Sequence, residues 1–409
     1  MAQHMQILDN ALDAVGKTPL IRLDKIAQSH GLKCNLLGKA EFMSVGGSVK
    51  DRIAKAMVEA AEKDGILIPG QSVVIEPTSG NTGSLPLILL GVASIDTVFG
   101  HVGIGLALAC AIKGYSVIIT LPNKMSLEKE ALLRALGAEV IRTPNVPHDS
   151  PESLISSVLS VARRLEKEIP GGVILDQYRN VNNPLAHEWT TGPEIIDAIV
   201  STPSTPARPS SGKVDAIVAG AGTGGTVTGL SRAVRKHNKD CIVVGIDPKG
   251  SILALPEALN VEGAGSSYVV EGIGYDFIPD VLVQKEVDAW LKTEDDESFL
   301  AVQQLMRKEG LLVGGSSGSA LSGALRWLKT EEGSKVASTP GANVVVVLPD
   351  GVRNYMSKPW FLKIAMESEP TPLREIIGKI LQKEVPAEHN APVPDVSTLS
   401  LKEHDLARL

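Results

Sequence analysis

Residues 214–237 read VDAIVAGAGTGGTVTGLSRAVRKH and contain the pattern that decides the fold. An apolar run at 214–218 leads into a glycine-rich loop at 220–226, and helical periodicity follows as far as residue 237. Because strand, loop and helix follow one another directly, glycine amides and threonine hydroxyls gather at a helix N-terminus, which favours phosphate binding. A purely structural turn remains the alternative for this loop taken alone.

Short apolar segments alternate with helical segments on both sides of this loop. Strands are predicted at residues 72–75, 115–121, 139–142, 173–175, 241–246 and 344–348, and helices at 50–63, 126–136, 151–168 and 193–200. Apolar strands separated by helices are typical of parallel sheets that are covered on both faces. We therefore predict an α/β protein, and the length of 409 residues fits two lobes.

Two segments interrupt the alternation. Residues 201–212, STPSTPARPSSG, are predicted to form a mobile, solvated loop. From about residue 367 onward the chain is rich in proline and shows one helical pattern, at 373–381, so this tail is expected to be an appendage.

The composition excludes several classes of protein. The 40 Lys and Arg residues are scattered among 47 acids, with a net charge of -7, so no nucleic-acid partner is expected. The most apolar stretch, 85–108, is interrupted by Pro86, Asp96 and His101, so no membrane segment is expected. The three cysteines have no C-x-x-C spacing and no secretory signal is visible, so we expect the protein to be cytoplasmic. The eight histidines form no cluster typical of a metal site, so no metal is expected.

Upstream of the glycine loop lies the motif GGSVKDR at 46–52. Ser48 is expected to cap a helix, and Asp51 to complete a capping box. Lys50 then lies in the first turn, where a cation opposes the helix dipole, so a neutral amine or a Schiff base suits this position better than an ammonium. An ordinary surface lysine is the alternative.

Two further motifs consist of small polar residues. EPTSGNTG at 76–83 leaves a strand, and its amides suit a carboxylate, although an ordinary turn has the same composition. VGGSSGSA at 313–320 matches the nucleophile elbow of hydrolases at Ser316, and Asp350 and His389 follow in the order of a catalytic triad. The alternative is that this segment forms the glycine-rich start of a helix. The G-x-G-x-x-G spacing at 220–225, with Asp247 about 20 residues on, also fits a dinucleotide site, but this hypothesis leaves the other motifs unexplained.

These four motifs, in this order, resemble the fold-type-II pyridoxal-phosphate enzymes that act at the β-carbon of amino acids. The segments EFMSVGGSVKDR, LDQYRNVNNPLAH, VEGIGYDFIP and VVLPDGVRNYMSK are similar to cystathionine β-synthases. Cysteine synthases typically have Asn-Pro before the lysine motif and lack the Tyr-Asp pair that follows Gly274 here. The similarity covers residues 7–358.

The resemblance implies a two-lobed fold like that of the tryptophan synthase β-subunit, with pyridoxal 5'-phosphate in the cleft between the lobes. The larger lobe is expected to comprise residues 1–45 and 171–365, the smaller lobe 46–170, and the tail 366–409. The implied reaction joins L-serine and L-homocysteine into L-cystathionine and water, in a homodimer. A cysteine synthase (O-acetylserine sulfhydrylase) and a cofactor-binding but inactive homologue are the alternatives.

The resemblance also assigns roles to individual residues. Lys50 is expected to form the Schiff base and to move the Cα proton, while Asn81 bonds the ring hydroxyl and Ser316 faces the pyridine nitrogen. A neutral hydroxyl there suits β-replacement better than transamination. The remaining cofactor residues cradle the phosphate and are Gly222, Thr223, Gly224, Gly225 and Thr226. The substrate-binding residues are expected to be Thr78, Ser79, Thr82, Gln177, Tyr178, Gly272 and Tyr275.

The chain departs from the family pattern at residues 84–103. In the family TSGNTG leads straight into IGLALA, which here begins only at Ile104. An unspliced intron, a tolerated insert and a functional element all remain open, and the displaced helix start is expected to disturb the substrate carboxylate site. No haem is expected, because no cysteine precedes Gly16, and no S-adenosylmethionine-binding module is expected after residue 358.

Overall fold

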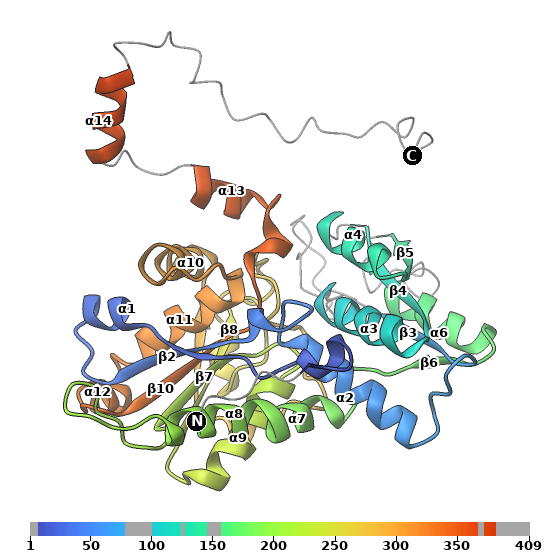
Figure 1. Ribbon diagram of the computed structural model, residues 1–409, viewed down its shortest axis with the longest axis horizontal. Coiled ribbons are helices and arrows are strands. Elements are labelled where there is room, and N and C mark those ends of the chain that lie inside the picture. The colour runs from blue at the N-terminus through green and yellow to red at the C-terminus, as the bar shows by residue number, and fades with distance from the viewer. Residues whose placement is uncertain (1–6, 78–99, 124–126, 145–156, 367–371, 382–409) are drawn as a thin grey trace. The chain divides into compact units, whose positions relative to one another are not determined.

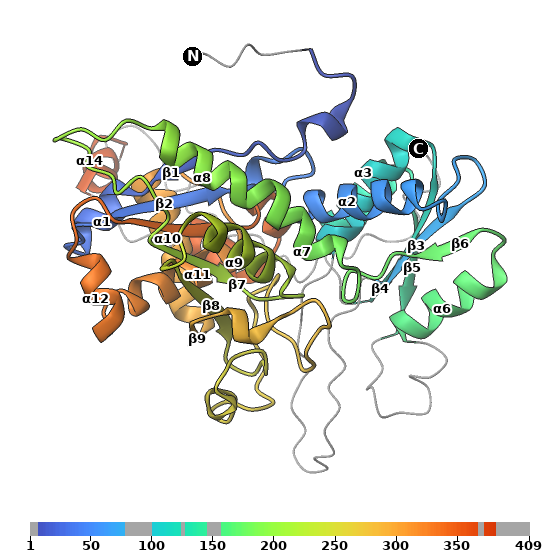
Figure 2. The same ribbon diagram turned by 90° about the horizontal axis from the view of Figure 1, so that it is seen from below.

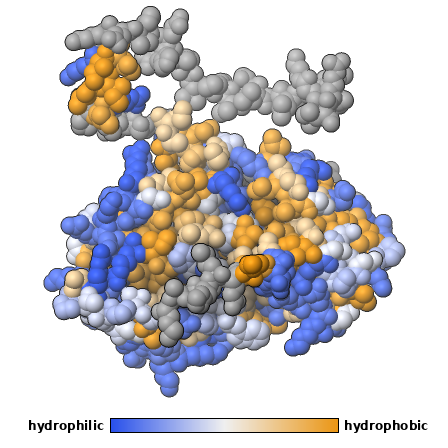
Figure 3. All heavy atoms as spheres, viewed as in Figure 1, coloured by the Kyte–Doolittle hydropathy of each residue, from blue (hydrophilic) through white to orange (hydrophobic). Residues whose placement is uncertain are grey.

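The computed structural model describes residues 7–77, 100–123, 127–144, 157–366 and 372–381. The chain divides into two compact units, Met1–Phe361 and Leu362–Leu409. The first unit holds both sheets (Figure 1). Helix α13 (Pro359–Met366) spans the boundary between the units. In the second unit helix α14 (Pro372–Leu381) confirms the predicted helix and exposes apolar side chains, including Ile376 and Ile380 (Figure 3).

The larger sheet has six strands in the order β1-β2-β10-β7-β8-β9. In chain order its strands are β1 (Leu20–Arg22), β2 (Asn35–Ala40), β7 (Ala216–Gly220), β8 (Ile242–Pro248), β9 (Ala289–Thr293) and β10 (Asn343–Leu348). Strand β1 is antiparallel to β2, and the other neighbours are parallel. The predicted parallel arrangement is thus confirmed for this sheet, apart from its antiparallel edge.

Helices cover both faces of the larger sheet. Its longer helices are α1 (Asp24–Ser29), α7 (Asn182–Ala186), α8 (Gly192–Ser201), α9 (Gly225–His237), α10 (Asp295–Glu309), α11 (Gly315–Trp327) and α12 (Glu331–Ala337). Apolar residues of α8 and α9 share one core with Ile217 and Val243. Helix α11 packs on the opposite face, where a side chain at Gly323 would collide with Ile246.

The smaller sheet has four parallel strands in the order β5-β4-β3-β6. Its strands are β3 (Val73–Pro77), β4 (Ser116–Pro122), β5 (Glu139–Thr143) and β6 (Gly172–Ile174), and its helices are α2 (Lys50–Lys63), α3 (Gly100–Lys113), α4 (Leu127–Ala135) and α6 (Val158–Glu168). Helices α2 and α3 share a core with β3 and β4, while α6 lies on the other side of the sheet (Figure 2). None of the helices in the described ranges is long and apolar enough to cross a membrane.

Short helical turns join these elements. The 3₁₀ turns are η1 (Ala11–Ala14), η2 (Glu41–Met43), η4 (Glu257–Asn260), η5 (Gln284–Glu286) and η6 (Val352–Tyr355). The segment η3 (His187–Thr191) is a π-helix between α7 and α8. Because the residues flanking η3 are themselves helical, residues 182–201 form one uninterrupted helical run.

Two predicted boundaries are wrong. Strand β6 pairs with β3, so residues 172–174 belong to the smaller sheet and the predicted change of lobe at residue 171 comes too early. The helix expected to begin at Ile104 begins at Gly100, so the last residues of the expected insert form the first turn of α3. The rest of that insert, 84–99, lies outside the described residues.

Candidate functional site

Lys50 is the first residue of helix α2. The turn before it is attached to the end of strand β10, because the Val49 N–H donates to the Pro349 carbonyl at 2.8 Å and Ser48 forms a bridge with Asp350. The lysine of the smaller lobe is therefore held directly against a strand of the larger one.

The predicted capping box is wrong. The Ser48 hydroxyl does accept a hydrogen bond from the Lys50 N–H at 3.2 Å, but Val49 occupies the cap position and makes no side-chain cap. The Asp51 carboxylate turns back instead and accepts from the Gly46 N–H at 2.7 Å. Asp51 thus stabilises the glycine turn that precedes the lysine, which is a different local role for the same residue.

The Lys50 amine has an unusual electrostatic environment. Although part of its side chain is exposed to the site, desolvation by the surrounding protein lowers the pKa of Lys50 to about 8, against an opposing effect of nearby Glu76. Burial and the neighbouring Asp176 raise the pKa of Glu76 to about 8. The lysine Nζ lies 3.5 Å from Oγ1 of Thr223, so the amine faces the glycine loop.

The glycine loop leaves no room for side chains. A Cβ at Gly225 would lie 1.9 Å from Asn183 Oδ1, and one at Gly222 would lie 2.5 Å from the Gly272 carbonyl oxygen. Gly224 occupies the cap position before helix α9 with a φ of 83°, and no side chain caps the helix. The first N–H groups of this 13-residue helix are therefore available to an anion.

Asn183 connects the loop to the predicted substrate residue Gln177. Its amide donates to Thr223 Oγ1 at 3.0 Å and to the Gln177 carbonyl at 2.7 Å. The Gln177 side chain is fully buried, and within the described parts of the chain its amide nitrogen and oxygen have no hydrogen-bond partner. A buried amide of this kind is suited to a polar ligand.

The other predicted site residues of the larger lobe lie near this loop. A Cβ at Gly272, whose φ is 101°, would lie 3.3 Å from Ser316 Oγ, and Ser316 is buried in the first turn of α11. Tyr178 and Tyr275 contact each other edge to face, with ring centroids 5.7 Å apart. Thr226 follows in the first turn of α9. The predicted residues Thr78, Ser79, Asn81 and Thr82 lie outside the described residues.

Arg52, two residues after the lysine, was not predicted from the sequence and anchors helix α2. Its guanidinium bonds both oxygens of Glu41 at 2.6 and 2.8 Å and both oxygens of Glu194 at 2.7 Å. Gly16 makes room for this contact, because a Cβ there would lie 2.7 Å from Arg52 Nη1. Lys39 binds the same Glu194 at 2.7 Å.

These charges are strongly coupled. Burial by itself raises the pKa of Glu194, but the hydrogen bonds and charge of Arg52, together with Lys39, bring it down to about 2. Both Arg52 and Glu41 are buried. The position of Lys50 thus depends on an ion network that joins α2 to β2 and α8.

A second buried ion cluster joins α4 to the loop before Gly272. Glu271 pairs with Lys129, which is fully buried, and with Lys358 at 2.7 Å. Burial raises the pKa of Glu271, and the two ammonium groups outweigh this effect and lower it to about 2. The loop that carries Gly272 is therefore tied to the smaller lobe.

Other hypotheses from the sequence find no matching geometry. Asp247, expected to bind a ribose in a dinucleotide site, is fully buried and pairs with Lys292 at 2.7 Å. Asp350 accepts from the Tyr355 hydroxyl at 2.5 Å and lies 3.0 Å from Nε2 of His101, while His389 of the hydrolase hypothesis is outside the described residues. No group of three metal-ligating side chains occurs in the described ranges.

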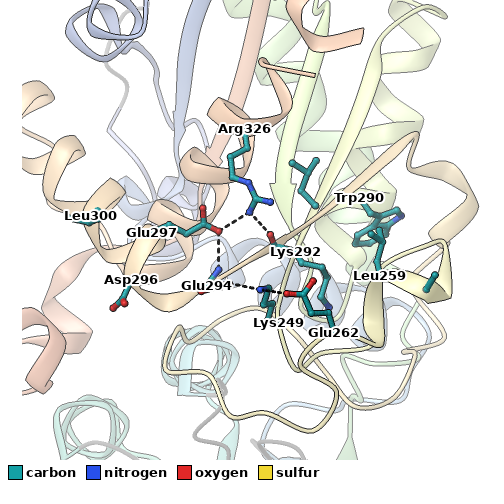
Figure 4. Close-up of a pocket in the computed structure, with 12 residues that line it drawn as sticks. Lys249, Leu259, Glu262, Trp290, Lys292, Glu294, Asp296, Glu297, Leu300 and Arg326 are labelled. Carbon is teal, nitrogen blue, oxygen red and sulfur yellow. Dashed lines mark hydrogen bonds and ion pairs between the residues drawn. The ribbon is translucent and has the colours of Figure 1, made fainter. Parts of the chain in front are cut away.

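The surface also carries a cavity of about 770 Å³ that includes none of the predicted site residues. Its cations are already paired: Lys249 binds Glu262 and Glu294, and Arg326 binds Glu297 (Figure 4). Because protein carboxylates satisfy these charges, we place the candidate site at Lys50 and the glycine loop rather than here.

Comparisons with known proteins identify the family of the chain. The profile described as pyridoxal-phosphate dependent enzyme matches residues 11–85 and 91–350. Cystathionine beta-synthase of Oryctolagus cuniculus is 48% identical over 359 residues, and that of Dictyostelium discoideum is 49% identical over 353. The matches cover 88 and 86% of this chain, which spans 57 and 61% of these curated relatives.

Solved structures share the fold. A hydrogen sulfide-producing enzyme from Fusobacterium nucleatum superposes with a TM-score of 0.68 at 29% identity, covering 86% of this chain and 98% of that one. O-ureido-L-serine synthase superposes with a TM-score of 0.70 at 26% identity, covering 91% of this chain and 100% of that one.

Proposed function

Because the chain belongs to the pyridoxal-phosphate-dependent enzyme family, we propose that it joins L-serine and L-homocysteine into L-cystathionine and water. The match confirms the predicted family, the fold-type-II α/β class and the dependence on pyridoxal phosphate. The substrates are inferred from the cystathionine beta-synthases, which are 48 to 49% identical but considerably longer than the matched region.

The observation that carries the proposal is the contact between Lys50 and Thr223. Lys50 and Thr223 are 173 positions apart in the sequence, and their contact places a partly deprotonated amine at a helix N-terminus that suits a phosphate. The glycine loop fits such a group, because the positions of Gly222 and Gly225 leave no room for side chains and no side chain caps the first amides of α9. Residues 222–226 would hold the phosphate, and Ser316, near Gly272, would face the ring nitrogen.

Pyridoxal phosphate, when bound, supplies the electron sink that stabilises negative charge at the amino acid Cα. The protein supplies the base and the orientation. With a pKa of about 8, Lys50 is deprotonated in about a tenth of the molecules at pH 7, far more than an ordinary lysine, so its amine can accept the Cα proton. The charge of nearby Glu76, whose own pKa is raised to about 8, opposes the lowering of the Lys50 pKa.

The remaining predicted residues would bind the substrate. The orphaned amide of Gln177 would donate to the substrate carboxylate, as would Thr78, Ser79 and Thr82, while Asn81 would bond the cofactor hydroxyl. The pair of rings formed by Tyr178 and Tyr275, beside Gly272, would limit the size of the side-chain pocket. These roles follow from the family resemblance and are part of the proposal.

We extend the proposal to the cellular context. The cysteines Cys34, Cys110 and Cys241 are buried free thiols, which supports a reducing compartment such as the cytoplasm. The family resemblance supports a homodimer, which the mass from light scattering would test. No nucleic-acid or membrane partner is proposed.

The visible spectrum of the purified chain tests the function. With cofactor bound, L-serine is expected to shift the absorption band and L-homocysteine to restore it, with cystathionine as the product. Restoration by sulfide but not homocysteine would identify a cysteine synthase instead. A coloured protein that is indifferent to L-serine would be an inactive homologue, and Lys50→Ala provides the control for a signal unrelated to the lysine.

The segment 84–103 needs its own experiment. Since helix α3 already begins at Gly100 and His101 packs against Asp350, deleting only residues 84–99 keeps these contacts. If the segment disturbs the site, the deletion should raise turnover. Equal turnover with and without residues 84–99 would contradict the expected disturbance and support a tolerated insert, and lower turnover would support a functional element.

A further inference from the structure

The helical run 182–201 contacts both halves of the proposed cofactor site. On one face it carries Asn183, which bonds Thr223, and His187, which contacts Thr226. Farther along the same run Glu194 binds Arg52, next to the lysine. Helix α9 lies alongside this run in Figure 2, and the two pack against each other.

His187 is buried between two threonine hydroxyls. Its Nδ1 lies 2.9 Å from Thr191 Oγ1, and its Nε2 lies 3.2 Å from Thr226 Oγ1. Only 1% of the histidine is exposed. Burial, together with the charges of Arg52 and Lys50, lowers the pKa of His187 well below 6.5 against the opposing charge of Glu194, so the ring is neutral.

Close packing fixes these distances. A Cβ at Gly229 of α9 would lie 2.1 Å from the Pro184 carbonyl oxygen and 2.8 Å from the His187 Cβ. A Cβ at Gly192 would lie 2.2 Å from that of Ala233. The two glycines let the helices approach within backbone contact, so the Cβ of His187 is held close against helix α9, which carries Thr226.

A neutral imidazole has one N–H and one lone pair, so the two tautomers have opposite consequences. If Nδ1 carries the proton, Nε2 must accept from the Thr226 hydroxyl, and the threonine proton is used within the protein. If Nε2 carries the proton, it donates to Thr226 Oγ1, and the Thr226 proton is free to point toward the glycine loop. Only the second arrangement gives a bound phosphate an extra donor.

We infer that His187 is a positioning residue for the cofactor phosphate: it accepts from Thr191 at Nδ1 and donates from Nε2 to Thr226, whose own proton is thereby directed to the phosphate. The inference rests on the proposed cofactor site and adds a residue outside the glycine loop. Every donor in the chain from Thr191 to the phosphate then has an acceptor, with the charged phosphate oxygen at its end.

The tautomer is measurable on the wild-type protein without any amino-acid substrate. In the cofactor-loaded protein with ¹⁵N-labelled histidine, the resonances of His187 are identified by their loss in His187→Gln. We expect Nε2 to show the protonated shift and Nδ1 the unprotonated one. An Nδ1–H tautomer or a doubly protonated ring would overturn the inference. The tautomer is read on the wild-type protein, and His187→Gln serves only to assign the resonances, once its circular dichroism matches that of the wild type.

Variants test whether the histidine acts through Thr226. His187→Leu should weaken pyridoxal phosphate binding about tenfold, whereas His187→Gln, which keeps a donor near Nε2, should restore most of the affinity. In a Thr226→Val background His187→Leu should have no further effect; losses that add would overturn the inference. His237, exposed at the end of α9, provides the control His237→Gln, which should bind the cofactor normally.

Failure of the inference and failure of the proposed function are distinguishable. If the wild-type chain binds no pyridoxal phosphate, the proposed cofactor site is wrong and the inference falls with it. If the cofactor binds at Lys50 but His187 shows the other tautomer, or if His187→Leu binds it as tightly as the wild type, only the inference is wrong. The circular dichroism of each variant confirms that the comparison is made between folded proteins.

Discussion

Replacing Arg52 by methionine should strongly destabilise the protein and disturb Lys50, which lies two residues before it in helix α2. The methionine keeps much of the side-chain volume but removes four charged hydrogen bonds, two to Glu41 and two to Glu194. Glu194 keeps Lys39 at 2.7 Å, but the fully buried Glu41 loses its cation. Removing one partner of a buried ion pair costs about 3 to 5 kcal/mol, since it leaves an uncompensated charge.

Urea unfolding followed by circular dichroism measures this loss, and the retention of pyridoxal phosphate after gel filtration reports on the site. The matched control is Lys335→Met, because Lys335 forms an exposed pair with Glu331 at 3.6 Å. That variant should change the unfolding free energy by less than about 0.5 kcal/mol. Combining Arg52→Met with Glu41→Gln should recover part of the loss, since the unpaired carboxylate is then neutral. A cost below about 1 kcal/mol for Arg52→Met would refute the reasoning.

Three further predictions concern the same site. The rate at which the apoprotein binds pyridoxal phosphate, measured by absorbance, should increase as the pH rises through about 8. At this pH, the lowered pKa of Lys50, its amine loses the proton that prevents it from attacking the aldehyde. A rate that does not change between pH 6 and 9 would contradict this prediction. Lys129→Met should lower the unfolding free energy by about 3 kcal/mol near pH 7. Because the pKa of Glu271 is depressed, its ion pair stabilises the protein fully above pH 4.5, the ordinary pKa of a glutamate, and this stabilisation is lost as the pH falls toward about 2. The difference in unfolding free energy between wild type and Lys129→Met should therefore shrink between these pH values. A constant difference would show that the ion pair is not its source. Gly225→Ala should weaken cofactor binding at least about tenfold, because the new methyl group would lie 1.9 Å from Asn183 Oδ1, and unchanged affinity in a titration would show that the loop adapts.

Local sequence patterns predicted an element correctly where its structure depends on residues that are close together in the chain. Helix α2 begins and ends at the predicted residues 50 and 63, because apolar residues at helical spacing meet a stop at Gly65 and Pro69. The glycine loop likewise follows a strand and opens a helix as predicted. Both features depend on residues that are neighbours in the chain.

Features that depend on distant partners could not be predicted in this way. Arg52 meets Glu194, 142 positions away, and no local pattern marks either residue. Strand β6 has three residues, too few to indicate which sheet it joins. Asp51 had the spacing of a capping box, but the N–H of Gly46 competes for its carboxylate in the folded turn. Strands β2 and β9 and helix α10 were not predicted, because their partners in the sheet and core are remote in sequence.

The helical run 182–201 also has a thermodynamic consequence. Asn183 and His187 contact the glycine loop, and Glu194 binds Arg52 of the lysine helix, so neither the loop nor that helix can unfold without releasing this run. A ligand that binds only the intact cleft therefore stabilises both lobes together, and at 100 times its dissociation constant the gain is about 2.7 kcal/mol. A cofactor bound at the proposed site would therefore raise the melting temperature of the whole first unit, and not only stabilise the glycine loop.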